Sequence, residues 1–290
     1  MEIIVVQKTK KYLKELKEMN VTDILISDNT FSSAVNFLKN EEIAEMNEAV
    51  HDSGMRTIVR VDRLYHQDEI NDLKNYLSFL NDIGVDKILC SDIAVTMLIK
   101  ENDYTMKTIY APETLLTNSY DVKQLKNDGV DSCIISKDIP FENILRIAKN
   151  NPQYCYLRVF GQILISYSRR RFISAYLKKE DEYTDNYFLQ EEKRDFLMPI
   201  VEKKSGCWLY GYSLESFGQL KEICDSEVKG IIIDEMFQND LFILEIVKIH
   251  RDILDDKIDY KMAVQRLKEL DQKSNYGSIA QVKQTALEKE

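Results

Sequence analysis

Hydrophobic residues recur along the chain in short continuous runs, each entered by a turn and left at a small or charged residue. The pattern is clearest in four phrases, Met19–Asp28, Ile83–Asp92, Asp128–Lys137 and Ser226–Glu235. Continuous apolar runs are typical of strands covered on both faces, as the parallel strands of α/β proteins are. Four further runs have the same character: Glu2–Val6, Thr57–Val61, Lys107–Ala111 and Tyr154–Phe160. The sequence therefore predicts eight strands.

Helical periodicity lies between these strands. One apolar stripe is formed by Ile70, Leu73, Leu77 and Leu80, and a second by Leu214, Phe217, Leu220 and Ile223. Glycines stand where a left-handed residue would end a helix before the next strand, at Gly54, Gly84 and Gly129. Eight strands, each followed by a helix or an insertion, predict an α/β fold of the (β/α)8 TIM-barrel type, with an open doubly wound sheet as the alternative.

The segment from Gly161 to Tyr212 interrupts this rhythm and predicts an insertion after the seventh strand. It ends in a hairpin, MPIVE-KKSG-CWLYG, that turns at Lys204-Ser205-Gly206. Insertions after barrel strands lie on the carboxyl-terminal face, where barrel active sites lie. We expect a barrel domain over residues 1–240 that includes this insertion (161–212), two C-terminal helices (Leu241–Leu254 and Tyr260–Leu270) within residues 241–272, and a disordered tail over residues 273–290.

Composition narrows the class of protein. A chain of 290 residues with 44% hydrophobic residues can bury a large core without disulfides. The formal net charge of -10 argues against a general polyanion-binding surface, so we expect no DNA partner, and any RNA contact must be local. The first apolar stretch is five residues long, too short for a signal peptide or a membrane span, which predicts a cytoplasmic protein without a membrane partner.

The five cysteines are scattered at Cys90, Cys133, Cys155, Cys207 and Cys224. They show neither a CxxC pair nor the short Cys/His spacing of a zinc or iron–sulfur site. We interpret them as reduced, buried thiols and predict no metal site in this chain.

Charged residues follow the predicted strands. The set comprises Asp28, Asp62, Asp92, Glu113, Lys137 and Asp234. In a barrel the ends of these strands meet at one mouth, which makes Glu113, Asp62 and Asp234 the candidates for catalysis. An alternative for Asp28 and Asp92 is that they cap the helices that follow.

A second candidate segment is Ser166-Tyr167-Ser168-Arg169-Arg170-Arg171, where the seventh strand enters a hydroxyl-rich turn and three arginines. Guanidinium groups present fork donors suited to carboxylate or phosphate, which favours contact with RNA or another anion. The alternative is a solvated charged face. Asn118 and Lys137 complete the expected binding residues.

A serine nucleophile has little support. His51 and His250 fall in predicted helices, only His66 lies in a plausible loop, and the sequence has no GxSxG elbow. HExxH, P-loop and GxGxxG motifs are also absent from the sequence.

The segment GQILISYSRRRFIS, residues 161–174, resembles the signature of the collagenase-like peptidases, family thirty-two of the unknown-type peptidases, which reads roughly HGxxCxSYSGRCxxS. The order of strands, turns and helices over about residues 1–255 is similar to the family as well. The resemblance implies a barrel-like domain. In several bacterial members it also implies an iron–sulfur cluster and a role in hydroxylation or RNA modification.

The chain departs from the signature where the chemistry would lie. Leu164 and Arg171 replace the two signature cysteines, Phe160 replaces the preceding histidine, and the family's KI(E/D)G reads Ile232-Ile233-Asp234-Glu235. Leucine and arginine cannot supply a thiolate to iron. We therefore expect no cofactor in this chain and an iron–sulfur cluster only in a partner paralogue.

Within the family, the chain most resembles the shorter of two paired proteins of Gram-positive bacteria that are similar to the prephenate-dependent tRNA hydroxylation proteins, which make 5-hydroxyuridine at the wobble position. The shared phrases are an ETT-like Glu113-Thr114-Leu115 and an SKR-like Ser168-Arg169-Arg170. The resemblance implies a subunit that works beside a longer, cluster-bearing paralogue, with tRNA as a further partner.

Three functions stay open on the sequence. The favoured one is a subunit of a tRNA wobble-uridine 5-hydroxylation system in which Arg169–Arg171 contact RNA or an organic acid. The others are a peptidase, as the family name states, and a non-catalytic barrel scaffold.

Overall fold

Eight parallel strands close into a barrel. The computed structural model describes residues 1–34, 38–112, 116–178, 187–190, 192, 197–270 and 276–278. The barrel strands are β1 (Glu2–Val6), β2 (Asp23–Ser27), β3 (Arg56–Val61), β4 (Lys87–Cys90), β5 (Lys107–Tyr110), β6 (Ser132–Ile134), β7 (Cys155–Ser168) and β11 (Gly230–Asp234). Each pairs with the next, and β11 pairs with both β7 and β1, which closes the ring. The predicted (β/α)8 barrel is therefore confirmed, and the open sheet is excluded.

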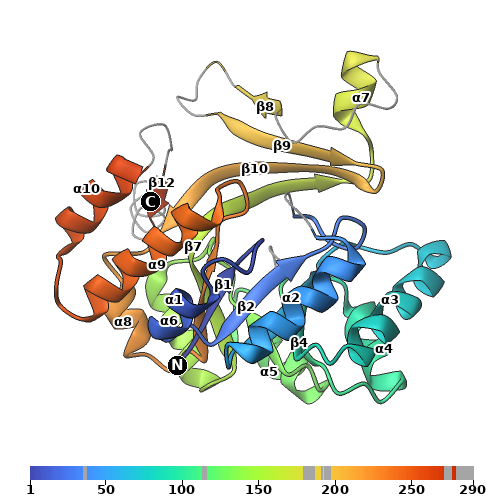
Figure 1. Ribbon diagram of the computed structural model, residues 1–290, viewed down its shortest axis with the longest axis horizontal. Helices are drawn as coiled ribbons and strands as arrows, with labels where there is room; N and C mark the ends of the chain where they lie inside the picture. The colour runs from blue at the N-terminus through green and yellow to red at the C-terminus, as the bar shows by residue number, and fades with distance from the viewer. Residues whose placement is uncertain are drawn as a thin grey trace.

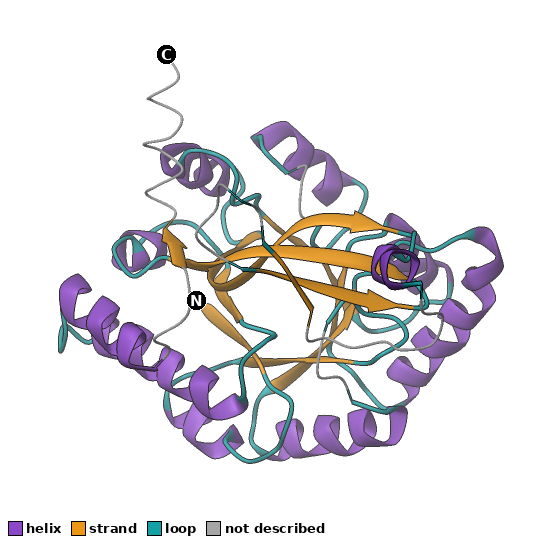
Figure 2. Ribbon diagram, turned by 90° about the horizontal axis from the view of Figure 1, so that it is seen from above, coloured by secondary structure: helices purple, strands orange, loops and turns teal. Residues whose placement is uncertain are grey.

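Helices surround the ring, as Figure 2 shows from above. Between the barrel strands lie α1 (Leu13–Glu18), α2 (Asn40–Asp52), η1 (Gln67–Glu69), α3 (Ile70–Asp82), α4 (Ile93–Glu101), α5 (Ser119–Asn127), α6 (Phe141–Asn150), α7 (Phe172–Leu177) and α8 (Leu220–Cys224). Gly54, Gly84 and Gly129 follow α2, α3 and α5 with φ of 71°, 76° and 76°, as expected. The main hydrophobic core lies between the helices and the outward-facing side chains of the strands, with no contribution from α7, none of whose residues is buried.

The barrel interior is apolar in the middle and charged at both ends, because alternate residues of each strand point inward. The middle is filled by Ile4, Leu25, Ile58, Leu89, Ile109, Ala111, Tyr156 and Ile232. At the amino-terminal end, Lys87 Nζ lies 2.7 Å from Glu2 and 2.9 Å from Asp23, and Arg56 pairs with the same two carboxylates. Burial would raise the pKa of Glu2, but hydrogen bonds from Lys87 and Tyr156 lower it to about 2.

Strand β7 is long enough to belong to two sheets. Because β6 ends at Ile134, one edge of β7 beyond Tyr156 is free, and β10 (Gly206–Glu215) pairs antiparallel with that edge from Phe160 to Ser168. β9 (Met198–Lys203) and β8 (Tyr187–Leu189) follow in order. We call β7 from Phe160 to Ser168, together with β10, β9 and β8, the roof sheet, because it lies above the barrel strands in Figure 1 and runs across the ring in Figure 2.

The region between β7 and β11 differs from the sequence prediction in two ways. The predicted hairpin is present, with its turn between Lys203 and Gly206. However, β7 continues to Ser168, so Ser166, Tyr167 and Ser168 lie in a strand and not in a turn. The second predicted stripe is also wrong as a helix, because Leu214 lies in β10, which ends at Glu215, and α8 begins only at Leu220.

At the C-terminus, α9 (Asp240–Leu254) and α10 (Tyr260–Leu270) match the two helices predicted there. α9 follows β11 and packs against α8 and α1, the neighbours expected for the last helix of a barrel. Most of the expected tail lies outside the described residues, but Tyr276–Ser278 forms β12, parallel to the end of β10. The boundary expected at residue 240 stays a prediction. None of the helices in the described ranges is long and apolar enough to cross a bilayer.

Gly161 is the residue at which β7 passes from the barrel into the roof sheet. It has a φ of +133°, and a Cβ there would overlap the carbonyl oxygen of Asp234. We therefore expect Gly161→Ala to lower the free energy of unfolding by at least about 2 kcal/mol through strain and displacement of β11.

Gly218→Ala is the matched control, because a Cβ there would make only an ordinary 3.6 Å contact with Tyr260. It should change the stability by less than about 0.5 kcal/mol in urea denaturation. Equal stabilities of the two variants would contradict the importance of close packing at Gly161.

Candidate functional site

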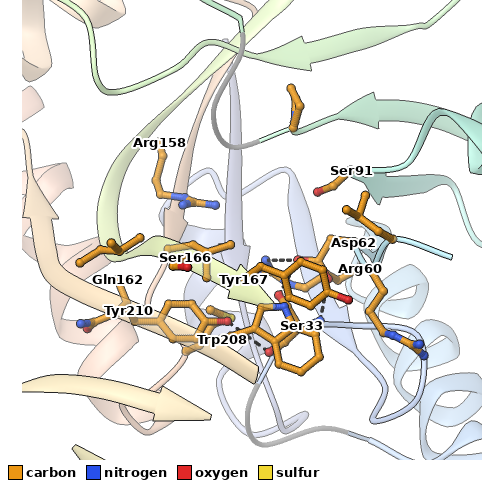
Figure 3. Close-up of a pocket in the computed structure, with 16 residues that line it drawn as sticks. Ser33, Arg60, Asp62, Ser91, Arg158, Gln162, Ser166, Tyr167, Trp208 and Tyr210 are labelled. Carbon is orange, nitrogen blue, oxygen red and sulfur yellow. Dashed lines mark hydrogen bonds and ion pairs between the residues drawn. The ribbon is translucent and has the colours of Figure 1, made fainter. Parts of the chain in front are cut away.

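A cavity of about 200 Å³ lies between the barrel mouth and the roof sheet. Its lining comes from the carboxyl ends of the strands, from β10 and from the loops after them: Ser33, Arg60, Asp62, Arg63, Leu64, Ser91, Pro112, Arg158, Gln162, Leu164, Ile165, Ser166, Tyr167, Trp208, Tyr210 and Met236. In Figure 3 the rings of Tyr167, Trp208 and Tyr210 gather on one side, with Arg158 and Ser91 on the other. The cavity occupies the position at which barrel active sites lie.

The floor of the cavity is a buried charge network. Asp234, at the end of β11, accepts from Arg60 Nη2 at 2.5 Å and from Arg158 Nη2 at 3.2 Å, and all three side chains are almost fully buried. Burial would raise the pKa of Asp234, but the two guanidinium groups outweigh it and hold that pKa below its ordinary value. Asp234 is therefore an ionised anchor for the arginines and not a free acid.

Asp62 extends the network toward the loop after β2. Its carboxylate accepts from Arg60 at 3.3 Å and from both the backbone N–H and the hydroxyl of Ser33 at 2.7 Å. The Nε of Arg60 is buried and has no hydrogen-bond acceptor among the described residues. Arg63 also lines the cavity and pairs with Glu69 at 2.6 Å. Three guanidinium groups in the lining favour an anionic or strongly accepting ligand.

The roof sheet contributes aromatic side chains to the cavity and is hydrogen-bonded to the loop after β2. The rings of Tyr167 and Trp208 lie 5.1 Å apart, and the hydroxyl of Tyr210 donates to the carbonyl of Ser33 at 3.2 Å. Lys203 Nζ donates to the carbonyls of Ser32 and Ala34 at 3.0 and 2.6 Å. Burial lowers the pKa of Lys203 to about 8. A ligand in the cavity would thus lie between arginines and aromatic rings.

The structure brings four of the predicted site residues to this cavity. Ser166, Tyr167 and Asp62 line it, and Asp234 lies directly beneath. Glu113 falls outside the described residues. Asn118 lies elsewhere, where it caps α5 by accepting from the N–H groups of Tyr120 and Asp121.

Lys137, in the loop after β6, is buried and pairs with Asp138 at 2.9 Å. Together with Arg158 it lines a smaller neighbouring cavity of about 20 Å³. Lys137 therefore stands next to the charge network without contributing to the main cavity.

The arginine run lies at the outer end of β7, and two of its members already hold carboxylates. Arg169 Nη1 pairs with Glu69 at 2.8 Å, and Arg171 Nε lies 3.5 Å from the buried Glu202. Arg170 is exposed, and its backbone N–H donates to the Ser168 hydroxyl. The run is thus partly neutralised and presents Arg170 to solvent.

The two aspartates with an alternative capping role behave differently. Asp92 caps α4 by accepting from the N–H of Ala94 at 2.9 Å, as that alternative states. Asp28 is buried and accepts from the N–H groups of Thr30 and Phe31 within the loop after β2. Both aspartates shape loops at the mouth and do not line the cavity.

Sequence reasoning missed Arg60 and Arg158, the two arginines of the floor. The signal was available in the two-residue period of the strands: Arg60 follows the inward-facing Ile58 by two positions, and Arg158 follows Tyr156 in the same way. A charged residue at an inward position near the carboxyl end of a barrel strand marks the mouth.

The histidines give no triad at the cavity. His51 Nε2 lies 2.8 Å from Asp86 on the outside of the barrel, and His250 is buried in α9, where burial lowers its pKa to about 4. In the described ranges, one group could hold a metal ion, His66, Asp68 and Glu69. Glu69 already accepts from Arg63 and Arg169, so this group is a weak candidate.

The cysteines do not fit an iron–sulfur cluster. Cys133 and Cys155 face each other across β6 and β7 with their sulfurs 3.8 Å apart, and the contact with Cys155 together with burial raises the pKa of Cys133. Cys90 lies in β4, Cys207 in β10 and Cys224 in α8, so the five thiols do not converge. Four thiolates around one centre are what such a cluster requires.

The sequence of this chain is similar to those of named proteins from other organisms. The chain is 25% identical over 224 residues to tRNA hydroxylation protein P2 of Bacillus subtilis (strain 168), which covers 74% of this chain and 72% of that one. It is 26% identical over 167 residues to tRNA hydroxylation protein P of Escherichia coli (strain K12). That match covers 54% of this chain and 37% of the E. coli protein, so the chain spans little more than a third of that relative.

Solved structures show only distant similarity. The U32 peptidase Mk0906 matches with a TM-score of 0.47 and 11% identity, over 56% of this chain and 70% of that one. Orotidine 5'-phosphate decarboxylase from Pyrococcus horikoshii OT3 matches with a TM-score of 0.47 and 9% identity, over 87% and 99% of the two chains. These similarities say nothing about chemistry. The family model for peptidase family U32 matches residues 29–285, and the chain therefore belongs to that family.

Proposed function

We propose that this chain is a subunit of a tRNA wobble-uridine 5-hydroxylation system that acts together with a cluster-bearing paralogue. One observation carries the proposal: the chain matches a protein named tRNA hydroxylation protein P2 over about three quarters of both sequences. A second relative, from E. coli, is named tRNA hydroxylation protein P. We transfer the activity from these relatives to this chain as a proposal, together with the cytoplasmic location that the sequence led us to expect.

In this proposal, the cavity is the site that binds a small-molecule ligand. Its buried arginines and aromatic roof suit an organic acid, whose carboxylate would accept from guanidinium donors while its apolar part packs against the rings. Arg170 at the outer end of β7, Lys178 at the end of α7 and Lys204 in the turn between β9 and β10 are exposed, and their charges suit phosphate groups of RNA. In this proposal, the organic acid binds in the cavity and the tRNA contacts the arginine run.

The redox half belongs to the partner in this proposal. The cysteines come from separate elements, and Leu164 and Arg171 stand at the signature positions, so this chain offers no thiolate set for a cluster. The charged side chains of the cavity floor pair with one another, which suits a role in binding and orienting more than in proton transfer.

Deletion of the gene is expected to abolish the wobble 5-hydroxyuridine-derived modification, measured by mass spectrometry of total tRNA digests. Complementation with Ser166→Trp should fail to restore it, because an indole at this position fills the cavity without removing a member of the charge network. Ser166→Ala, which leaves the cavity open, is the matched control and should restore the modification. Identical tRNA spectra before and after deletion would contradict the function, and would leave a peptidase or a scaffold as the alternatives.

Arg170→Gln is expected to weaken binding of an anticodon stem-loop RNA by the full protein, because one phosphate contact is lost. The slope of log Kd against log salt should fall by about 1, measured by fluorescence anisotropy. Arg146→Gln, an exposed arginine on α6, is the control and should leave both quantities unchanged. An unchanged salt slope in Arg170→Gln would remove the arginine run from the RNA interface.

A further inference from the structure

Glu235 is a buried acid directly behind the ligand cavity. It follows Asp234 at the end of β11 and is 1% exposed. One carboxyl oxygen accepts from the N–H of Phe237 at 3.1 Å, and the other lies 2.8 Å from the hydroxyl of Ser213 on β10. The same hydroxyl lies 2.7 Å from the side-chain oxygen of Gln162 on β7. Glu235, Ser213 and Gln162 therefore form one chain across three strands.

Hydrogen-bond counting fixes the protons in this chain. The amide nitrogen of Gln162 donates to the carbonyl of Gly211, and the reversed orientation would place two oxygens against each other. The side-chain oxygen facing Ser213 can therefore only accept. A serine hydroxyl has one proton, so it can donate to Gln162 or to Glu235 but not to both. Because the oxygen of Gln162 has no proton to give, both contacts are hydrogen bonds at once only if Ser213 donates to Gln162 and Glu235 itself carries a proton and donates it to Ser213.

The chain ends at a bulge that shapes the roof. Tyr210 pairs with Leu164 and Ser213 with Gln162, so β10 has one residue more than β7 between these pairs. The Gln162 amide satisfies the Gly211 carbonyl inside this bulge, next to Tyr210, whose ring lines the cavity. Bulges re-aim side chains near functional sites.

We propose that Glu235 is a positioning residue of the cavity, which, as a protonated carboxylic acid, orients Ser213 and Gln162 and so holds the bulge that places Tyr210 in the roof. The proposal rests on the proposed function only in taking this cavity as the ligand site. When Glu235 loses its proton, Ser213 turns its hydroxyl to the carboxylate. The side-chain oxygen of Gln162 then faces an oxygen lone pair without a donor, and the bulge loses its support.

The charges around Glu235 agree with a proton held at neutral pH. Burial and the charge of the adjacent Asp234 raise the pKa of Glu235 to about 7, against the hydrogen bonds that the ionised carboxylate would accept from Ser213 and Phe237 and the charge of Lys8. Because the folded pKa lies above the unfolded one, the stabilisation is complete below about pH 4.5 and is lost as the pH rises through about 7. The roof should therefore loosen on the alkaline side of neutrality.

Trp208 makes the proposal measurable, because it is the single tryptophan of the sequence and lines the cavity two residues before Tyr210. Its fluorescence in the full protein, followed from pH 5 to 9, should change with a midpoint near 7, the pKa of Glu235. Glu235→Gln keeps an amide donor in place of the acid proton. It should remove the transition near pH 7 and keep the low-pH signal through that pH. Ser213→Ala breaks the chain and should give the high-pH signal throughout.

Lys203 is the second titrating group near this reporter, with its Nζ 6.0 Å from the Trp208 ring. Lys203→Met should keep the transition near pH 7, so this variant distinguishes the titration of Lys203 from that of Glu235. A transition near pH 7 that survives in Glu235→Gln, or one that is lost only in Lys203→Met, would overturn the positioning role. Because no RNA or partner is present, such a failure would leave the tRNA modification result untouched.

Discussion

Two buried arginines share one buried aspartate at the mouth of this barrel, and the site depends on that arrangement. Arg60 from β3, Arg158 from β7 and Asp234 from β11 join strands that are distant in the sequence. Taking these charges out of water is costly, and the attraction between them offsets this cost only because the geometry is close and Asp62 adds a further carboxylate. Such a network adds little to stability over an apolar core, but it fixes which donors face the cavity.

The length of β7 turns this mouth into an enclosed site. A short β6 frees one edge of β7, and β10 takes that edge and carries the roof sheet across the opening. Gly161 allows the change of direction, because only glycine fits against the Asp234 carbonyl with this backbone conformation. The same strand thus supplies Arg158 to the floor and Ser166 and Tyr167 to the walls.

Much of the barrel was predictable from the sequence, because parallel strands covered on both faces read as continuous apolar runs. All eight runs are barrel strands. The stripe from Leu214 to Ile223 misled because all four of its apolar residues are buried, although a strand end, a turn and a short helix divide them. Period alone cannot distinguish one helix from such a succession.

The site was only partly predictable. Asp62, Asp234, Ser166 and Tyr167 follow from their places at strand ends, whereas Arg60 and Arg158 lie inside strands and need the inward parity of each strand, which requires the barrel to be known. The ion pairs of Arg169 with Glu69 and of Arg171 with Glu202 join positions about 100 and 31 residues apart, so no local pattern announces them. Because these pairs neutralise two of the three arginines, the cavity is a stronger candidate for the functional site than the arginine run.

A double-mutant cycle on Arg158 and Asp234 tests most directly whether the buried network holds the mouth together. Urea denaturation would give the free energy of unfolding of Arg158→Met, Asp234→Asn and the double variant. We expect each single change to cost about 3 kcal/mol or more, since it leaves a buried charge uncompensated, and the double variant to cost at least about 1 kcal/mol less than the sum. Losses that add to within about 0.3 kcal/mol would contradict a coupled network at the barrel mouth.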